Sequence, residues 1–394
     1  MRDLKKNNEI PNVPHLRFKE FSGEWKRYKC SDFLVNFPTN SLSWEMLSYN
    51  ASSEIFNLHY GLIHSGAPAL IDIKKYKLPC IINTNIKEQT VIENGDIIFA
   101  DASEDTNEIG KSVEFINTNN KIIYSGLHTI HTRDYKKLTI IGFKAFLFQS
   151  YYFHRQVERI TQGTKIYSLN FNNFKEIYVS IPNKTEQQKI TNFLTLIDKR
   201  IETQMKIIEE IKSLIYSIKN KIIENLIFVK WIKIKDICTI TTGKLDANAM
   251  KENGKYKFFT CSKDDYYINE YAFDGEALII SGNGDLGLIK YYKGKFNAYQ
   301  RTYILQNFKL SPIYVKFMME YYLPRKIYKE KNIGAMPYIV LSTIAELEIP
   351  VVDNRIIEKM ERLYLLLNKR QNTDNIQLNN LKKQKQFLLN NIFI

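Results

Sequence analysis

The 394-residue chain has few glycines (16) and prolines (10), and it has four cysteines. The scarcity of glycine and proline excludes a collagen-like or low-complexity linker chain. The cysteines are far apart and form no Cys-x-x-Cys pair, so we expect neither a zinc site nor a disulfide framework at Cys30, Cys80, Cys238 and Cys261. No uncharged apolar run approaches the roughly 18 residues of a membrane span, and no apolar stretch follows the charged N-terminus as in a secretory signal. We therefore expect a soluble, cytoplasmic protein with reduced thiols.

Basic residues outnumber acidic residues by 56 to 42, which gives a formal net charge of +14. This excess makes a polyanion the first partner to consider, and a general basic bias of composition is the alternative. With 44% hydrophobic residues the chain is too apolar to be disordered. Its length allows two or three folded domains of roughly 100–200 residues each.

Two long stretches carry apolar residues at alternating spacings of four and three. In the first, 183–228, glycine and proline are absent, and one seam contains Ile190, Leu194, Ile197, Ile201, Gln204, Ile208 and Ile211. In the second, 353–394, the equivalent seam contains Met360, Tyr364, Leu367, Asp374, Leu378 and Leu381. A sustained period of about 3.5 residues predicts coiled-coil helices that pack through these side chains. At 1.5 Å per residue, a helix of about 40 residues reaches roughly 60 Å and can hold two parts of a chain apart.

The two halves of the chain repeat one pattern. Lys369-Arg370 and Asp374 of the second seam stand where Lys199-Arg200 and Gln204 stand in the first. Ahead of the helices, two pairs of segments are similar: Asn94–Ala100 with Asp274–Ile280, and Phe174–Pro182 with Ile344–Pro350. We therefore predict two copies of a globular α/β module, each followed by a long helix, with boundaries at 1–182, 183–228, 229–352 and 353–394.

Within the modules, short apolar runs bounded by Gly, Asn or Asp predict strands. Such runs occur at 97–100, 138–141, 276–280 and 303–305. The runs 145–159 and 311–328 predict helices.

Sequences that resemble catalytic or nucleotide-binding motifs lack the context that those motifs require. Gly282–Gly287 matches Gly-x-Gly-x-x-Gly, but a strand-like run follows where a dinucleotide fold needs a helix, so we predict a hairpin. Asp72-Ile73-Lys74 is compatible with part of a nuclease site, although a solvated strand end is the simpler interpretation. The histidines show no metal-ligand spacing. We predict no catalytic and no metal-binding residues.

The remaining motifs suit recognition of DNA. Ala298–Tyr303 places Gln300 and Arg301 beside aromatic residues, and Ser125–Thr129 is its counterpart in the first half. Gln and Arg can form paired hydrogen bonds with adenine and guanine edges, and nearby lysines can hold phosphates. The candidate DNA-binding residues are Lys111, His128, Arg133 and Lys165 in the first half, and Lys255, Lys257, Lys263, Asn283, Lys290, Tyr299, Gln300 and Arg301 in the second. For each residue the alternative is a buried structural arginine or an ordinary solvated side chain.

The order of these motifs resembles the specificity subunit of a type I restriction–modification system over essentially the whole chain. The similar segments are the opening Pro14–Trp25, the start of the first helix with Glu186-Gln187-Gln188, the loops Gly163–Leu169 and Gly334–Leu341, and the close Leu381–Leu389. The second helix departs from the family pattern, because Asn354–Glu358 stands in place of Glu-Gln-x-x-Ile.

The resemblance implies a mixed α/β fold of two target-recognition domains separated by two long antiparallel coiled-coil helices, with a pseudo-two-fold internal repeat. It implies a subunit without catalytic activity, in which each domain binds one half of a bipartite, asymmetric site in double-stranded DNA. The helices would set the gap and dock two methyltransferase subunits, and two restriction/translocase subunits would join them. S-adenosylmethionine, ATP and Mg²⁺ would be bound by those partners, with no cofactor on this chain.

Two other classes stay open at this point: a stand-alone nuclease, and an RNA-binding or scaffold protein that assembles through its coiled coil. Cutting of plasmid DNA by the chain and Mg²⁺ alone would favour the nuclease. Competition between duplex DNA and RNA would test the RNA-binding protein.

Overall fold

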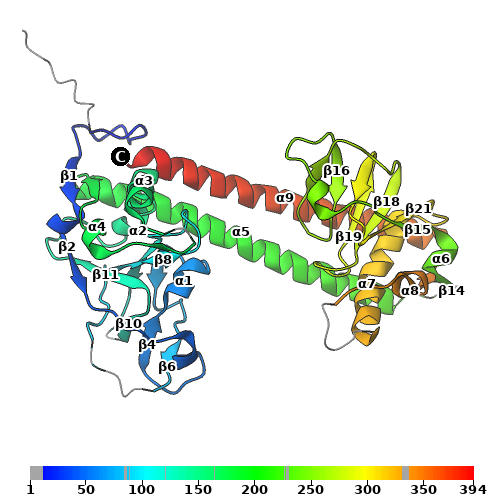
Figure 1. Ribbon diagram of the computed structural model, residues 1–394, viewed down its shortest axis with the longest axis horizontal. Coiled ribbons are helices and arrows are strands. Elements are labelled where there is room, and N and C mark those ends of the chain that lie inside the picture. Colours follow the sequence, from blue (N-terminus) through cyan, green and yellow to red (C-terminus); the bar gives the residue numbers. More distant parts are fainter. Residues whose placement is uncertain are drawn as a thin grey trace, which may run out of the picture. The chain divides into compact units, whose positions relative to one another are not determined.

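The computed structural model describes residues 12–83, 87, 89–119, 121–163, 165–225, 227, 230–330 and 337–394. The chain divides into two compact units: residues 1–205 with 377–394 form unit 1, and residues 206–376 form unit 2. Both long helices contribute to both units (Figure 1). Some positions named in the sequence analysis lie outside the described residues. They are Gly334 in the predicted loop before the second helix, and residues 226 and 228 at the end of the first predicted helix.

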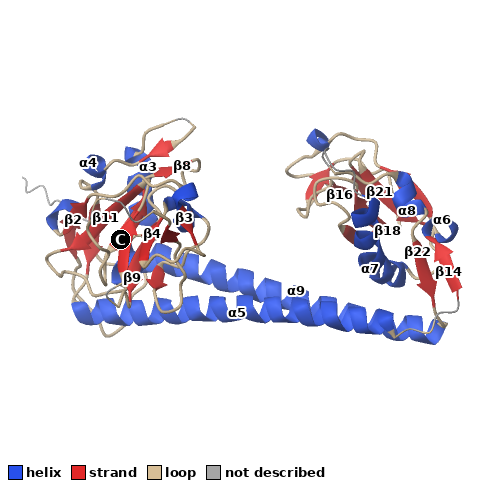
Figure 2. Ribbon diagram, turned by 90° about the horizontal axis from the view of Figure 1, so that it is seen from below, coloured by secondary structure: helices blue, strands red, loops and turns tan. Residues whose placement is uncertain are grey.

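Unit 1 contains two main sheets beside its helices (Figure 2). The larger sheet has the strand order β2 (Leu34–Phe37), β11 (Thr129–Asp134), β7 (Ile97–Ala100), β9 (Ser112–Ile116) and β5 (Leu70–Asp72). The smaller has the order β10 (Ile122–Ser125), β4 (Ile55–Leu58), β6 (Cys80–Ile81) and β3 (Leu47–Ser48). Two further ladders pair β1 (Lys26–Lys29) with β13 (Tyr178–Ile181), and β12 (Tyr167–Ser168) with β8 (Ala102–Ser103). The short helices are α1 (Tyr60–His64), α2 (Phe143–Leu147), α3 (Tyr151–Ile160) and α4 (Phe171–Phe174).

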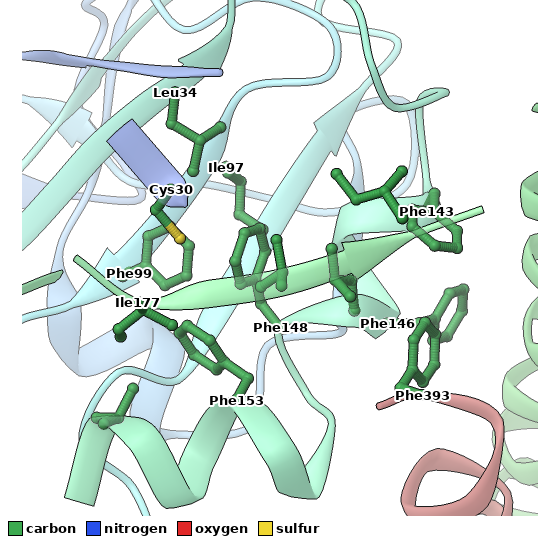
Figure 3. Packing of buried hydrophobic residues seen from close by; sticks show 14 of the residues in the cluster. Cys30, Leu34, Ile97, Phe99, Phe143, Phe146, Phe148, Phe153, Ile177 and Phe393 are labelled. Carbon is green, nitrogen blue, oxygen red and sulfur yellow. The ribbon is translucent and has the colours of Figure 1, made fainter. Parts of the chain in front are cut away.

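An aromatic core joins the larger sheet of unit 1 to its helices (Figure 3). Phe99 of β7 lies 4.9 Å from Phe148 and 4.7 Å from Phe174, measured between ring centroids. Phe393, just after the last helix, packs 5.8 Å from Phe143 of α2. Burial of several large rings is the main source of stability here, since each removes 150–250 Å² of apolar surface from water.

Unit 2 repeats this plan with fewer strands. Its larger sheet has the order β15 (Thr239–Thr242), β21 (Thr302–Gln306), β18 (Glu276–Ser281) and β19 (Ile289–Lys293). Its smaller sheet has the order β17 (Tyr266–Ile268), β16 (Tyr256–Phe259) and β20 (Phe296–Ala298), and β14 (Lys230–Lys233) pairs with β22 (Glu348–Val351). Helix α7 (Pro312–Glu330) packs against β18, β19 and β22, and α6 (Ile234–Ile237) and α8 (Leu341–Ala345) are short.

Strand pairing confirms the predicted duplication. Each module contains an equivalent parallel pair, β10 with β4 and β20 with β16, and unit 1 has a further parallel pair, β5 with β9. In each, the next strand (β11 or β21) enters the larger sheet between two antiparallel neighbours. The mixed α/β fold class that the sequence predicts is therefore confirmed.

The long helices are α5 (Lys184–Glu224) and α9 (Asn354–Ile392). Within unit 1, Ile190 near the start of α5 shares a core with Leu389 near the end of α9, and Lys385 Nζ lies 2.7 Å from the Asp198 carboxylate. Within unit 2, Ile223 near the end of α5 shares a core with Met360 near the start of α9. The two helices thus run antiparallel within each unit.

Burial follows the 3.5-residue seam. The buried seam residues are Ile190, Leu194, Gln204, Ile208, Met360, Tyr364, Asp374 and Leu381, and the half-buried ones are Ile197, Ile201, Ile211, Leu367 and Leu378. The buried Asp374 carboxylate accepts a hydrogen bond of 2.9 Å from Arg370 Nε, one helical turn earlier.

Two predicted elements are wrong in detail. Residues 138–141 form a loop, not a strand, because side chains bind their backbone: Gln187 accepts from the Ile140 N–H at 2.8 Å and donates to the Leu138 carbonyl at 3.0 Å. The predicted helix 145–159 is broken into α2 and α3. Ser150 begins the second piece, since its hydroxyl accepts the Phe153 N–H at 3.3 Å.

Candidate nucleic-acid interface

Three loops of unit 2 meet at one end of its sheets. They are residues 260–265 after β16, the β18–β19 hairpin, and residues 299–301 between β20 and β21. The Cys261 carbonyl accepts the Asp285 N–H at 2.9 Å, and the Asp285 carboxylate accepts the Lys263 N–H at 2.7 Å. The Arg301 carbonyl accepts the Gly282 N–H at 3.0 Å. Backbone bonds therefore hold the three loops together.

The glycine-rich motif 282–287 is the tip of this hairpin, as predicted, because β19 follows it rather than a helix. Gly284 has φ +59°, and a Cβ there would lie 2.6 Å from the Cys261 carbonyl oxygen. Only glycine permits this approach, so the motif serves loop packing. Asn283, beside it, is half-exposed.

Gln300 and Arg301 project from the β20–β21 loop as exposed side chains. Their backbone is fixed by the Gln300 N–H, which donates to the Leu245 carbonyl at 2.8 Å. Within the described part of the chain, neither side chain has a hydrogen bond or ion pair. Two groups that could make paired hydrogen bonds with base edges are thus held on an ordered loop with their polar atoms unused. Half-buried Tyr299 precedes them.

Lys257 and Lys290 lie in the same region but are engaged with one carboxylate. Lys257 Nζ lies 2.9 Å and Lys290 Nζ 3.7 Å from Asp265, and Lys290 also donates to the Lys263 carbonyl at 2.8 Å. Hydrogen bonding from Lys257 lowers the pKa of Asp265 and keeps it ionised. One positive charge of the pair remains uncompensated, which suits a backbone phosphate. The Lys263 side chain is exposed at this end, whereas Lys255 lies at the opposite end of β16.

The equivalent loop of unit 1 is residues 126–128, between β10 and β11. His128 adopts a φ of +55° and is 49% exposed at its side chain. Its Nδ1 lies 3.3 Å from the Asp101 carboxylate, and its ring centroid lies 5.2 Å from Tyr60. His128 therefore occupies the position that corresponds to Arg301 in unit 2.

A group of rings surrounds His128 that the sequence analysis missed. His59 and His64 lie 4.6 Å and 5.8 Å from Tyr60, and Trp44 lies 5.1 Å from His59, all between ring centroids. The available signal was His59 just before α1 and His64 at its last position, beside Tyr60. The module thus presents rings in edge-to-face and tilted contacts where unit 2 presents amide and guanidinium groups.

The other candidates in unit 1 are largely paired or lie elsewhere. The Arg133 guanidinium binds both oxygens of Asp96, at 2.6 and 2.8 Å, and lies 2.8 Å from Glu93. These contacts fit the alternative interpretation, in which Arg133 has a structural role. Burial alone would raise the pKa of Asp96, but hydrogen bonds from Arg133 and His131 lower it. Lys111 lies 2.8 Å from Glu108, and exposed Lys165 belongs to the loop before β12.

The remaining motifs have structural roles. Asp72 ends β5, and its carboxylate accepts hydrogen bonds from Asn117 Nδ2 at 2.9 Å and the Lys74 N–H at 3.1 Å, as expected for a strand end.

All four cysteines are unpaired. No group of three or more His, Cys, Asp or Glu side chains within the described ranges could hold a metal ion. The helices that the structure describes lack the combination of length and apolar character needed to cross a membrane.

The opening segment of the chain contacts the first turn of α5 within unit 1. The buried Glu186 carboxylate accepts hydrogen bonds of 2.7 Å from both Arg17 Nε and Nη2, and one of 3.3 Å from Trp25 Nε1. This bidentate pair and the indole hydrogen bond tie the opening segment to the helix.

Replacing Glu186 by Ala is expected to lower the free energy of unfolding of unit 1 by about 3–5 kcal/mol, because it leaves a mostly buried Arg17 without its partner. Urea denaturation of the full chain measures this loss. The matched control is Gln188→Ala, an exposed position two residues away, which should cost less than about 0.5 kcal/mol. Equal losses for the two variants would show that the ion pair contributes nothing.

All six histidines lie in unit 1, and this predicts a difference in pH sensitivity between the units. Burial and the nearby His128 lower the pKa of His59, and burial lowers that of His154. Below about pH 6.5 the unfolded chain therefore binds protons that the folded unit resists. The contribution of neutral His59 and His154 to the free energy of unfolding is full above about pH 6.5. It is lost as the pH falls toward the lower pKa values of these histidines in the folded unit.

Hydrogen exchange of the full chain, measured from about pH 7.5 to 5.5 and corrected for the intrinsic rate, should show unit 1 losing protection while unit 2 changes less. His59→Gln with His154→Gln should flatten the dependence, whereas His15→Gln should not. The same slope in the double variant would contradict the assignment.

Comparison with known proteins places this fold. The family model of the type I restriction modification DNA specificity domain matches residues 80–213 and 229–386, more than half of the chain. The EcoDI specificity subunit of Escherichia coli is 38% identical over 142 residues, which cover 34% of this chain and 31% of that protein. The MpnII specificity subunit of Mycoplasma pneumoniae is 29% identical over 136 residues, which cover 32% of this chain and 40% of that protein. The matches thus span less than half the length of these two relatives.

Two solved structures share the fold over nearly their full lengths. A type I system S subunit from M. genitalium has a TM-score of 0.58 at 17% identity, covering 97% of this chain and 99% of the other. A chain from a study of assembly and conformational transition of the type I system has a TM-score of 0.56 at 14% identity, covering 93% and 96%. Fold and family model together define a protein with a duplicated DNA specificity domain. The chain belongs to the type I restriction modification DNA specificity family.

Proposed function

We propose that the chain is the DNA-specificity subunit of a type I restriction–modification complex and has no catalytic activity of its own. Each module binds one half of a bipartite site in double-stranded DNA. The family match and the duplicated fold support this function, whereas no described group of residues supports a nuclease.

One observation carries the proposal. The same loop of the duplicated fold presents different chemistry in the two modules: Leu127-His128 in unit 1, and Gln300-Arg301 in unit 2. Side chains at equivalent positions of a repeated scaffold would meet equivalent positions of their half-sites. Because the side chains differ, the two half-sites should differ, and the target is asymmetric.

The helices would fix the gap between the half-sites and dock two methyltransferase subunits, and two restriction/translocase subunits would join for cleavage. Exposed apolar residues on the outer faces of α5 and α9, including Leu196, Leu214, Leu366 and Phe387, are compatible with such docking. S-adenosylmethionine, ATP and Mg²⁺ would be bound by the partners. The complex would act on DNA in the cytoplasm.

Methylome sequencing of a host that carries this chain with its methyltransferase tests the proposal. The expected result is one asymmetric motif of two short half-sites separated by a gap of unspecified bases. A continuous motif, or no motif beyond that of a host without the chain, would overturn it. Footprinting of the purified complex on the motif should protect both half-sites.

A further inference from the structure

A pocket of about 310 Å³ lies in unit 1 between α3, β1 and β13, and none of the candidate DNA-binding residues lines it. Three arginines contribute to it: Arg27 from β1, and Arg155 and Arg159 from α3. Tyr152 and Tyr178 supply aromatic walls, and no acidic side chain is part of the lining.

The pocket is held in shape by contacts that leave the guanidinium groups available. The Gln156 side chain donates to the Tyr178 carbonyl at 2.8 Å and accepts the Tyr178 N–H at 3.0 Å, which joins α3 to the edge of β13. The Arg27 guanidinium stacks 4.3 Å from the Tyr178 ring centroid. Both contacts restrict motion of the lining and so lower the entropy cost of binding a ligand.

The lining also includes Ile394, and within the described residues the three guanidinium groups have no Asp or Glu ion-pair partner. The side chains of Arg27, Arg155 and Arg159 are all exposed. Several like charges on one rigid concave surface favour an anion that can accept bidentate hydrogen bonds.

The unpaired positive charge in the pocket contrasts with the recognition end of unit 1, the end that carries loop 126–128. Lys111 at that end is paired with Glu108, whereas Arg133, which is paired with Asp96 and Glu93, lies toward the other end of β11. The recognition end therefore offers less free positive charge than the corresponding end of unit 2, although every DNA-binding module needs phosphate contacts to fix its register. The strand that follows α3 in sequence, β12, pairs with β8 next to Asp101, the partner of His128.

We propose that the pocket formed by Arg27, Arg155 and Arg159 binds a phosphate group of the DNA backbone and anchors the first module on the duplex. This inference rests on the proposed function and adds to it a contact that carries no sequence information. It assigns positioning to α3 and base reading to the loop around His128.

The test measures DNA binding by the full chain assembled with its methyltransferase subunits. One duplex contains the target sequence found by methylome sequencing, and the other is a random duplex of equal length. The variant Arg27→Gln, Arg155→Gln, Arg159→Gln should bind both duplexes more weakly by a similar factor, about 10- to 100-fold, and the slope of log K against log salt should become shallower by roughly two to three. The methylated sequence should not change. The charge-conserving variant with Lys at the three positions should retain most of the slope.

The matched control removes three charges from unit 1 outside the pocket: Lys19→Gln, Lys26→Gln, Lys184→Gln, all exposed positions. Its salt slope should stay at the wild-type value. An unchanged slope in the arginine variant would overturn the inference, as would equal changes in both variants, which indicate diffuse charge. Weaker assembly with the methyltransferase at unchanged DNA affinity would also overturn it, because the occupant would then be an acidic protein segment. Absence of specific binding by the wild-type complex would instead count against the proposed function.

Discussion

A seven-residue insertion placed in both long helices, after Gln204 in α5 and after Asp374 in α9, is expected to lengthen the gap of the recognised site by about three base pairs. Seven helical residues add about 10.5 Å, and the duplex rises about 3.4 Å per base pair. A whole heptad keeps each seam in register, so the helices should still pack. The half-site sequences should stay the same, because the insertions touch neither module.

Methylome sequencing of a host with the altered chain reads the new gap directly. The matched control carries the insertion in α5 alone, which shifts its seam against that of α9 and should lower stability and methylation together. Continued methylation at the original spacing by the doubly extended chain would contradict the role of the helices as a spacer.

Replacing Gln300 and Arg301 by Ala is expected to abolish discrimination at the second half-site while leaving the first intact. Each paired hydrogen bond to a base edge contributes about 1–3 kcal/mol of discrimination, so the double variant should lose roughly 100-fold or more in preference over a mismatched half-site. The loop should stay folded, because its contacts with Leu245 and Gly282 are made by backbone atoms.

Competition binding measures this with duplexes that carry substitutions in one half-site at a time. Lys255→Ala is the control, since its exposed side chain lies at the far end of β16 and should leave preference at both half-sites unchanged. If the double variant weakens binding to all duplexes equally, Gln300 and Arg301 contact the backbone and not the bases.

The features predicted best from sequence are those set by periodicity and repetition. The seam from Ile190 to Ile211 predicts a long helix because a 3.5-residue pattern over many turns has one interpretation, and α5 has that form. The duplication is visible because similar residues lead into the equivalent strands, Asn94-Gly95-Asp96 before β7 and Asp274-Gly275-Glu276 at the start of β18. The hairpin at Gly282 follows from the strand pattern on both sides of it.

The features predicted least well depend on contacts between distant residues. Residues 138–141 have the composition of a strand, but Gln187, far along the chain, takes their backbone hydrogen bonds. Arg133 is predicted as a candidate DNA contact with a structural cation as the alternative, and only the position of Asp96, just before the neighbouring strand β7, shows its ion pair. The rings around Tyr60 come from three separate segments, so no local pattern joins Trp44, His59 and His128.

The short ladders β1–β13 and β14–β22 have a consequence for how such a chain can change its target. In each module the strand by which the chain enters pairs with the strand by which it leaves, as Lys26 with Ile181 and Lys230 with Val351. The two ends of a module are therefore neighbours, and the candidate DNA-binding loops lie between them in sequence. Recombination at two junctions could exchange one module as a cassette, giving a new half-site while the other half-site and the gap are inherited unchanged.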